Sequence, residues 1–355
     1  MDSINTKTYF KEMDFLRFVA AFFVVIYHFT LFYQERVNQY VKMFMHNLGI
    51  GVDLFFIISG FLIVYLLITE KEKMKTISLF KFYIRRILRI FPLYYLIVGI
   101  SYLLFHKSNP EIQYSKYLLF MGNFWMINVD SWTASTLNPL WSICIEEHFY
   151  LLIPVLLLLL PKKTFPYLFY FIIFCSLFFR VYITKNVENN WMNIYCHTLS
   201  KCDLLAIGGL FAYYFQIKKL NYNIPIYLFY STLFCLILFM IFIDSVDYTT
   251  WYYAGFRKYI FAIPMLILFY AIIIQSNKYS FIDKITNNKI INYLGKISFG
   301  LYIYHSLISE ISLRILNRTS LKIVLLNLVL TIILSSLSFE LFEKQILKMK
   351  MKFEV

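Results

Sequence analysis

The sequence predicts an all-α, polytopic membrane protein with about ten transmembrane helices, and two observations lead to this prediction. Apolar residues make up 60% of the 355 residues and charged residues only 15%, which is far from the composition of a soluble domain. Apolar runs close to the ~20 residues that cross a hydrocarbon core also recur along the chain. We expect spans at 14–33, 49–69, 83–105, 140–160, 165–183, 197–215, 224–244, 256–275, 294–313 and 321–343.

The first run is predicted to be a retained helix, because it lacks the small-residue cleavage site of a signal peptide and contains charge. We expect residues 1–355 to form a single membrane-embedded domain with no appended soluble domain, since the N-terminal dozen residues and the tail after Glu343 are too short for a core of their own. The longest connector, 106–139, is partly apolar and aromatic. It is predicted to lie on the outer membrane surface as a lid.

The distribution of basic residues predicts the orientation of the chain. The net charge of +14 would suggest nucleic acid for a soluble protein, but in a membrane protein the bias of Lys and Arg between loops sets the topology. If the N-terminus is cytoplasmic, the cytoplasmic loops and tails hold about twice the Lys and Arg content of the other face, as the positive-inside rule requires. Both termini are therefore predicted to be cytoplasmic. The residues that carry this bias are Lys7, Lys11, the cluster 71–89, Lys162, Lys163, Lys218, Lys219, Lys278, Lys284, Lys289 and the C-terminal lysines.

The cysteines predict neither a metal site nor a disulfide framework. There are five of them, an odd number, and they lie within or beside the predicted spans at no spacing typical of metal ligands. We expect them to be packing residues.

The first span, in "MDFLRFVAAFFVVIYHF", contains two ionisable residues. Arg17 and His28 are 11 residues apart, which on an α-helix places them within about 20° of one face and about 16 Å apart along the axis. Arg17, near the helix end, is expected to snorkel to the membrane interface. His28 lies deeper, where an ionisable group costs about 2.5–3.5 kcal/mol, so it is expected to face a site or pathway. A hydrogen-bonded packing role for His28 is the alternative.

Other polar residues recur at a similar predicted depth, which favours a hydrated internal cavity in the outer half of the membrane. They are Asp53, Glu146, Glu147, Lys201 and Asp203, with His305 near the middle of its span. Each has a structural alternative. Asp53 would cap its helix, Lys201 and Asp203 would neutralise one another, and one of the two glutamates would lie at the interface.

The basic cluster at the start of the third span contains Arg86 and Arg89. Because they are three residues apart, they share one helical face. Two guanidiniums on one face form a clamp for a phosphorylated ligand. Topology determination or binding to anionic lipid head groups explains the same cluster equally well.

Six segments, in this order, resemble the acyltransferase-3 family of integral membrane acyltransferases, which O-acylate bacterial surface glycans and related acceptors. The segments are "MDFLRFVAAFFVVIYHF", "GVDLFFIISGFLI", "FYIRRILRIFPLYYL", "NPLWSICIEEHFYLLIP", "SKCDLLAIGGLFA" and "ISFGLYIYHSLI". The resemblance covers nearly the whole chain. Two residues depart from the family pattern: Lys201 stands where Arg is frequent, and His148 where Gln is common.

The resemblance implies a multi-pass protein of the bacterial cytoplasmic membrane that moves an acyl group, with acetyl expected, from cytoplasmic acyl-CoA to a hydroxyl of a surface glycan or its lipid-linked precursor. Acyl-CoA is a co-substrate, and no permanently bound cofactor or metal is expected. On this basis the CoA phosphates are expected at Arg17, Arg86 and Arg89. The acceptor cavity or the thioester oxyanion is expected at Asp53, Lys201, Asp203 and His305.

In the same scheme His28 is the general base, because an imidazole exchanges protons near neutral pH, and Glu146 orients His28 or holds the acceptor. An acyl-histidine intermediate is a second route for His28. With no further domain expected, transfer is either direct or completed by a separate extracytoplasmic partner.

The rival functions are a glycan or lipid-linked sugar transporter, for which the sequence shows no inverted repeat, and a polysaccharide polymerase or ligase. A succinyl or other acyl donor would leave the mechanism unchanged.

Overall fold

The computed structural model describes residues 10–31, 37–188, 190–220, 222–243, 250–316, 320–350 and 353. Within them the secondary structure is helical throughout. The helices are α1 (Lys11–Thr30), α2 (Gln39–Asn47), α3 (Gly51–Met74), α4 (Leu79–Phe105), α5 (Tyr114–Leu118), α6 (Gly122–Asn128), α7 (Leu140–Leu159), α8 (Phe165–Asn186), α9 (Trp191–Cys196), α10 (Thr198–Gln216), α11 (Ile226–Phe242), α12 (Trp251–Gln275), α13 (Ser280–Thr286), α14 (Lys289–Lys296), α15 (Ser298–Leu316), α16 (Leu321–Ser338) and α17 (Lys344–Lys350). A π-helical segment, Phe339–Glu343, joins α16 to α17.

The all-helical prediction is confirmed, and a helix occupies each of the ten predicted spans. Seven helical segments in the described part of the chain are long and apolar enough to cross a bilayer: 11–30, 39–74, 79–108, 140–159, 162–186, 253–278 and 321–349. The chain is therefore a multi-pass membrane protein. Helices α10, α11 and α15 occupy the other three predicted spans, and the count of ten crossings stays a prediction. Lys7 and the span ends at 32–33 and 244 lie outside the described residues.

Contacts between helix ends define two opposite faces of the bundle. Lys71, near the end of α3, donates to the main-chain carbonyls of Leu157, Leu158 and Leu160 at the end of α7. Lys11, at the start of α1, lies 3.6 Å from Asp283 of α13. We call this end, which also carries Arg85 and Lys162, the basic face. The basic loops from which the cytoplasmic side was predicted lie at this face. Which face is cytoplasmic stays a prediction.

The opposite face collects the other helix ends. Asn47, after α2, donates to the carbonyls of Met240 and Ile243 at the end of α11. The connector 106–139 belongs to this face: it contains α5 and α6, and its Asn123 is fully buried and donates to the carbonyl of Cys196, at the end of α9. The connector is therefore packed against the bundle at this end of the molecule.

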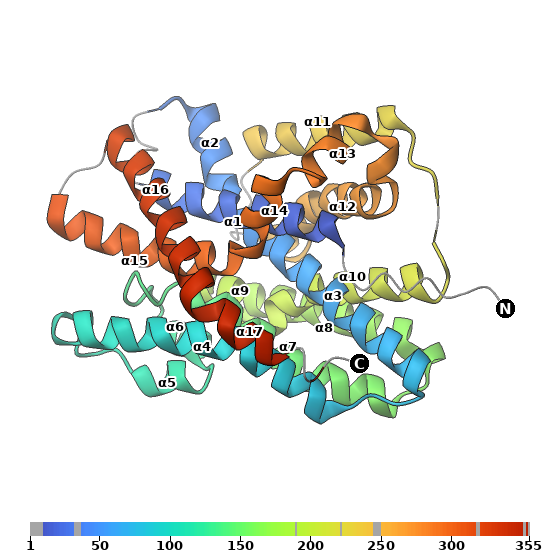
Figure 1. The fold of residues 1–355 in the computed structure, drawn as a ribbon. Coiled ribbons are helices and arrows are strands. Elements are labelled where there is room, and N and C mark those ends of the chain that lie inside the picture. The colour runs from blue at the N-terminus through green and yellow to red at the C-terminus, as the bar shows by residue number, and fades with distance from the viewer. Residues whose placement is uncertain are drawn as a thin grey trace.

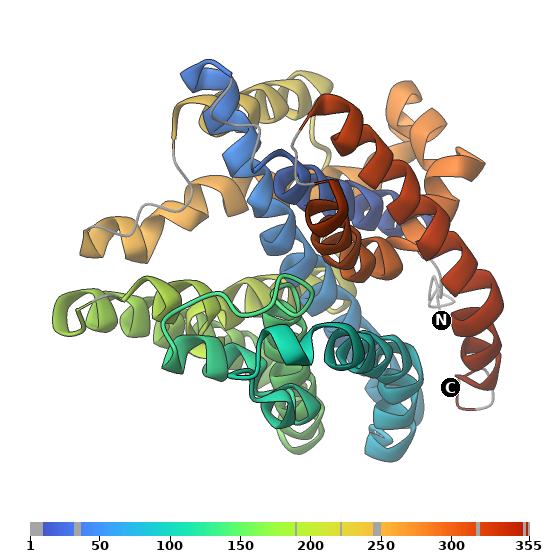
Figure 2. The same cartoon turned by 90° about the vertical axis from the view of Figure 1, so that its left-hand side faces the viewer.

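Helix α3 runs through the middle of the molecule, whereas α16 and α17 cross its outside (Figures 1 and 2). The main chains of α3 and α10 touch. A Cβ atom added to Gly60 would overlap the carbonyl of Leu205, and one added to Gly208 would overlap the carbonyl of Ile57. Small residues allow this approach, as is typical of membrane helix pairs. The contact fixes α3 as the element against which the candidate site is built.

Candidate active site

A pocket lies among α1, α3, α4, α7 and α15, and it brings together residues that are far apart in the sequence. Its free volume is about 80 Å³, which is room for a few water molecules and far below the roughly 300–1,000 Å³ of a drug-sized ligand site. Side chains must therefore move when a substrate enters. The polar residues of the lining are Arg17, Ser59, Arg86, Arg89, Ser142, Glu146, Tyr150, Ser298 and Tyr302.

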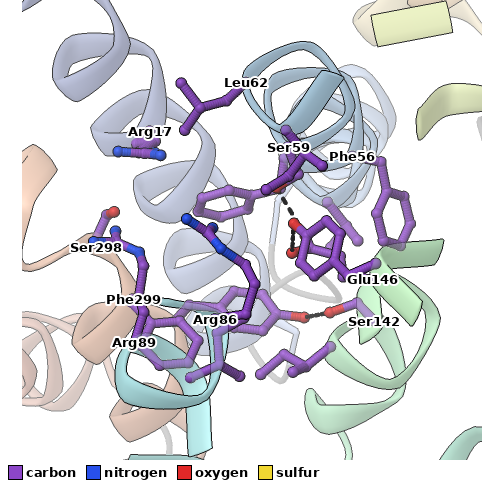
Figure 3. A pocket seen from close by; sticks show the side chains of 17 residues that line it. Arg17, Phe56, Ser59, Leu62, Arg86, Arg89, Ser142, Glu146, Ser298 and Phe299 are labelled. Carbon is purple, nitrogen blue, oxygen red and sulfur yellow. Dashed lines mark hydrogen bonds between the residues drawn. The ribbon is translucent and has the colours of Figure 1, made fainter. Parts of the chain in front are cut away.

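Three arginines occupy one side of the pocket, and Ser59, Ser142 and Glu146 occupy the other (Figure 3). Arg17 comes from α1 and lies 3.9 Å from Asp14, while Arg86 and Arg89 come from one face of α4, as their spacing predicted. Arg86 is only 8% exposed, and its Nε finds no hydrogen-bond acceptor in the described part of the chain. A buried guanidinium with an unused donor is costly, so this wall of the pocket is suited to an anionic ligand.

The neighbouring Arg85 does not join this group. Its guanidinium lies 3.1 Å from Glu70 of α3 and donates to the carbonyl of Phe353. The basic cluster of α4 is therefore divided between a pocket and an ion pair at the basic face.

Glu146 is held in place by two hydroxyl groups. Ser59 of α3 donates to its Oε1 at 3.1 Å, and Tyr150, one turn further along α7, donates to its Oε2 at 2.7 Å. No hydrogen bond links Glu146 to His28 among the described residues. The neighbouring Glu147 lies outside the pocket lining, with a buried Oε1 that has no hydrogen-bond partner in the described chain. Glu146 therefore faces the three guanidiniums across the pocket.

His28 lies next to His305 of α15, at 4.7 Å between ring centroids. Its Nδ1 lies 2.9 Å from the carbonyl oxygen of Val24. Since a carbonyl only accepts, Nδ1 carries the proton of the neutral ring and Nε2 keeps its lone pair. His305 is fully buried, and neither of its nitrogens makes a hydrogen bond with the described residues. Two imidazoles thus meet with unused hydrogen-bonding capacity.

The histidine pair lies beside the pocket and not in its lining. Tyr302, one turn before His305 on α15, does line the pocket, and its ring centroid is 5.9 Å from that of His305. The Tyr302 hydroxyl lies 2.6 Å from that of Ser142 and donates to the carbonyl of Pro139. Ring contacts through His305 and Tyr302 therefore connect His28 to the arginine-lined pocket. The sequence predicted one continuous stripe from Arg17 to His28 and gave no sign that His28 lies outside the pocket lining.

Lys201 and Asp203 do not neutralise one another, so that structural alternative is wrong. Lys201 forms a 3.2 Å ion pair with Asp53 of α3, and its ammonium also lies over the ring of Tyr195, 5.0 Å from the centroid. Residues two apart on a helix point in different directions, which explains why the two side chains have different partners. Asp53 and Lys201 join the first turn of α3 to the first turn of α10, at the opposite face.

Asp203 lies in a separate buried network that the sequence analysis missed. Its Oδ2 accepts from Arg180 of α8 at 2.9 Å and from Tyr259 of α12 at 2.6 Å, and Lys258 donates to its Oδ1 at 2.5 Å. Arg180 could have been found, because it is an ionisable residue within a predicted span. The departure at His148 is also outside the pocket lining: its Nδ1 pairs with the hydroxyl of Thr198.

The uncharged partners in the site carried no sequence signal. Ser59, Ser142, Tyr150 and Tyr302 are ordinary residues of membrane helices, and only the packing of α3, α7 and α15 shows that their hydroxyls converge. In sum, Arg17, Arg86, Arg89 and Glu146 share one pocket, His28 and His305 form a pair beside it, Asp53 pairs with Lys201, and Asp203 lies apart.

Comparison with known proteins gives one family and several relatives. A family described as "Acyltransferase domain" matches residues 10–340. The chain is 28% identical to the peptidoglycan O-acetyltransferase OatA of Listeria monocytogenes, over 97% of this chain and 56% of that protein. It is 27% identical to the O-acetyltransferase OatA of Staphylococcus aureus, over 98% of this chain and 59% of that protein. The chain thus spans less than two thirds of the length of these relatives. No solved structure matches.

Proposed function

The chain belongs to the acyltransferase-3 family, and from this premise we propose that it is a membrane O-acyltransferase. It transfers an acyl group, with acetyl expected, from acyl-CoA to a hydroxyl of a cell-surface glycan or its lipid-linked precursor. A glycan of the peptidoglycan type is the first candidate acceptor, because a relative 28% identical to this chain is named a peptidoglycan O-acetyltransferase. The bacterial cytoplasmic membrane is the compartment in which CoA and a surface glycan are reached from opposite sides.

The observation that supports this proposal most strongly is the pocket in which Arg17, Arg86 and Arg89 face Glu146. Guanidiniums hold phosphate groups through paired N–H donors, and the unused Nε of Arg86 is such a donor. We assign the CoA phosphates to these three arginines. The narrow cavity suits the thin pantetheine arm better than a bulky ring, so the thioester end enters the bundle while the nucleotide stays near the basic face.

His28 acts as the general base in this proposal. The hydrogen bond from Nδ1 to the Val24 carbonyl leaves Nε2 able to take a proton. Nε2 removes the hydroxyl proton of the acceptor while the hydroxyl oxygen bonds to the thioester carbon. The C–S bond then breaks, the electron pair leaves with sulfur, and His28 returns the proton to the CoA thiolate. The acceptor gains an ester, and the enzyme returns to its starting state.

Tyr302 and His305 control how the thioester meets His28. Both connect the pocket to the base through ring contacts, so the acyl end must pass or displace the Tyr302 ring. The Tyr302 hydroxyl, which bonds to Ser142 and donates its one proton to the Pro139 carbonyl, can stabilise the thioester oxyanion if it turns that proton from the carbonyl to the oxyanion as charge develops. Glu146 then fixes Tyr150 and Ser59 on the wall opposite the arginines and does not orient His28 directly.

The test replaces His28 with Gln in cells whose surface glycan carries the ester. Glycan ester content, measured by mass spectrometry after mild base release, is expected to fall to the level of cells that lack the protein. His106→Gln is the matched control: this histidine stacks on Tyr102 at the opposite face, 4.7 Å between ring centroids, and lies outside the pocket. Normal ester content with His28→Gln, at equal protein level in the membrane, would exclude His28 as the base. A transporter would show no consumption of acyl-CoA by the purified protein.

A further inference from the structure

Four aromatic side chains gather at the opposite face of the bundle, next to the candidate site. We call Trp132, Trp141, Trp191 and Tyr195 the aromatic platform. Trp191 and Tyr195 of α9 stack at 5.0 Å with an interplanar angle of 7°, and Trp132 stands edge-on to both, at 5.6 Å and 5.7 Å. Trp141, at the start of α7, lies 5.0 Å from Tyr195. Three of the five tryptophans of the sequence thus meet in one cluster.

The platform leads from the surface toward the interior. Trp132, in the connector 106–139, is 38% exposed, whereas Trp141 is 4% exposed; Trp191 and Tyr195 are partly exposed. The Trp141 ring lies 6.0 Å from Phe56, which lines the pocket, as does Ser142, the next residue along α7. The aromatic surface therefore continues to the wall of the pocket that faces the arginines.

Charged groups border the platform. The ammonium of Lys201 lies over the Tyr195 ring and pairs with Asp53. A sugar ring has two kinds of surface: axial C–H groups that pack on aromatic faces, and equatorial hydroxyls that need hydrogen-bond partners. Aromatic rings beside an ion pair offer both. The carboxylate of Asp53 repels an anionic phosphate and the indole faces do not pair with it, so this face is better suited to a saccharide ring than to the phosphates of CoA.

We propose that the aromatic platform binds a sugar ring of the acceptor glycan and directs a neighbouring hydroxyl toward the pocket. This inference rests on the proposed function, since it names where that acceptor binds. The alternative is an interfacial belt, because Trp and Tyr are enriched where membranes meet water. A belt distributes single rings around the perimeter with their faces toward lipid. The platform rings instead pack on one another and touch residues of the pocket.

The test uses the purified full-length protein and, as the acceptor probe, the soluble disaccharide of N-acetylglucosamine and N-acetylmuramic acid. Trp132→Ala is expected to raise the KM for the disaccharide about tenfold, the effect of losing one good aromatic contact, and to leave the KM for acetyl-CoA unchanged. Trp132→Tyr is expected to restore most of the affinity. Tyr182→Ala is the matched control, because Tyr182 is 53% exposed near the end of α8 at the same face and lies outside the platform.

A direct measurement of disaccharide binding tests this proposal independently of the proposed acyl transfer. Disaccharide binding, measured by saturation-transfer NMR, is expected to be lost in Trp132→Ala and kept in Tyr182→Ala. If that result is found in a protein that transfers no acetyl group, the platform stands and the proposed function fails. Equal changes in the two variants would indicate an interfacial belt and overturn the proposal. Absence of disaccharide binding to the unaltered protein would overturn it as well.

Discussion

Replacing Asp203 with Asn tests whether its carboxylate binds substrate or holds the bundle together. The side chain is fully buried and accepts from Arg180, Lys258 and Tyr259, and from the main-chain N–H of Leu204. Asn keeps the volume but removes the negative charge that, among the described residues, alone contacts the two buried cations. It also turns an NH₂ group toward donors on one side. Removing one partner of a buried ion pair costs about 3–5 kcal/mol, because the remaining charge is left uncompensated.

The expected result is a loss of stability before any specific loss of catalysis. A destabilisation of that size lowers the unfolding midpoint by about 4–7 °C for a chain of this length. The measurement is thermal unfolding of the detergent-solubilised protein, followed by fluorescence-detected size exclusion, together with acetyl transfer at a temperature where both forms are folded. The double variant Asp203→Asn with Lys258→Met removes one cation as well and is expected to recover part of the lost midpoint.

Two outcomes would contradict this reasoning. An unchanged midpoint with lost transfer activity would show that the carboxylate acts on a substrate, as the sequence analysis expected for Asp203. A double variant less stable than Asp203→Asn alone would show that Lys258 contributes through packing and its hydrogen bond to the Ser200 carbonyl, and that the charge balance of the network is not what stabilises it.

Three further predictions follow from contacts in the structure. Gly208→Ala is expected to lower the yield and unfolding midpoint sharply, since its Cβ would overlap a main-chain carbonyl of α3, whereas Gly99→Ala, with nothing within 4 Å of the added atom, is expected to change neither. Glu146→Gln keeps an acceptor oxygen for one of the two hydroxyls and turns an NH₂ group toward the other, which can rotate to accept from it. It is expected to reduce turnover without unfolding; unchanged turnover would remove Glu146 from the site. Arg86→Gln is expected to weaken acetyl-CoA binding at least about tenfold by calorimetry, and an equal loss in Lys81→Gln would mean that only overall charge matters.

The helical segments could be predicted from the sequence because a membrane leaves the backbone few choices. Every buried N–H and C=O must be paired within the chain, so a long apolar run becomes a helix. The first predicted span, 14–33, corresponds to α1 at Lys11–Thr30, a shift of three residues toward the charged start. The first turn of α1 buries both Glu12 and Asp14, whereas apolar counting begins the span at Asp14 and leaves Glu12 outside it.

The partners of the polar residues could not be predicted in the same way. Periodicity along one helix places Arg17 and His28 on one face, but it does not show what packs against that face. Tyr302 and His305, which connect the pocket to His28, come from α15, more than 270 residues later. Asp203 and Arg180 are 23 residues apart on adjacent helices, and the cost of burying either one indicates that a partner exists without identifying it.

The buried guanidiniums of Arg180 and Arg86 differ in how many of their N–H donors are already hydrogen-bonded, and this difference matters more than their charge or depth. All three guanidinium nitrogens of Arg180 are used: Nε bonds to the Ala254 carbonyl, one terminal nitrogen to Asp203 and the other to the Gly255 carbonyl. A guanidinium with every donor occupied can bind a ligand only by giving up contacts within the protein. Arg86 is also buried, but its Nε has no acceptor among the described residues, and its side chain lines a cavity that it shares with two more arginines. A phosphate in that cavity would therefore remove a cost already present in the folded protein, whereas the same phosphate beside Arg180 would have to break a satisfied network. This difference is why we propose the CoA site at α1 and α4 and not at α8.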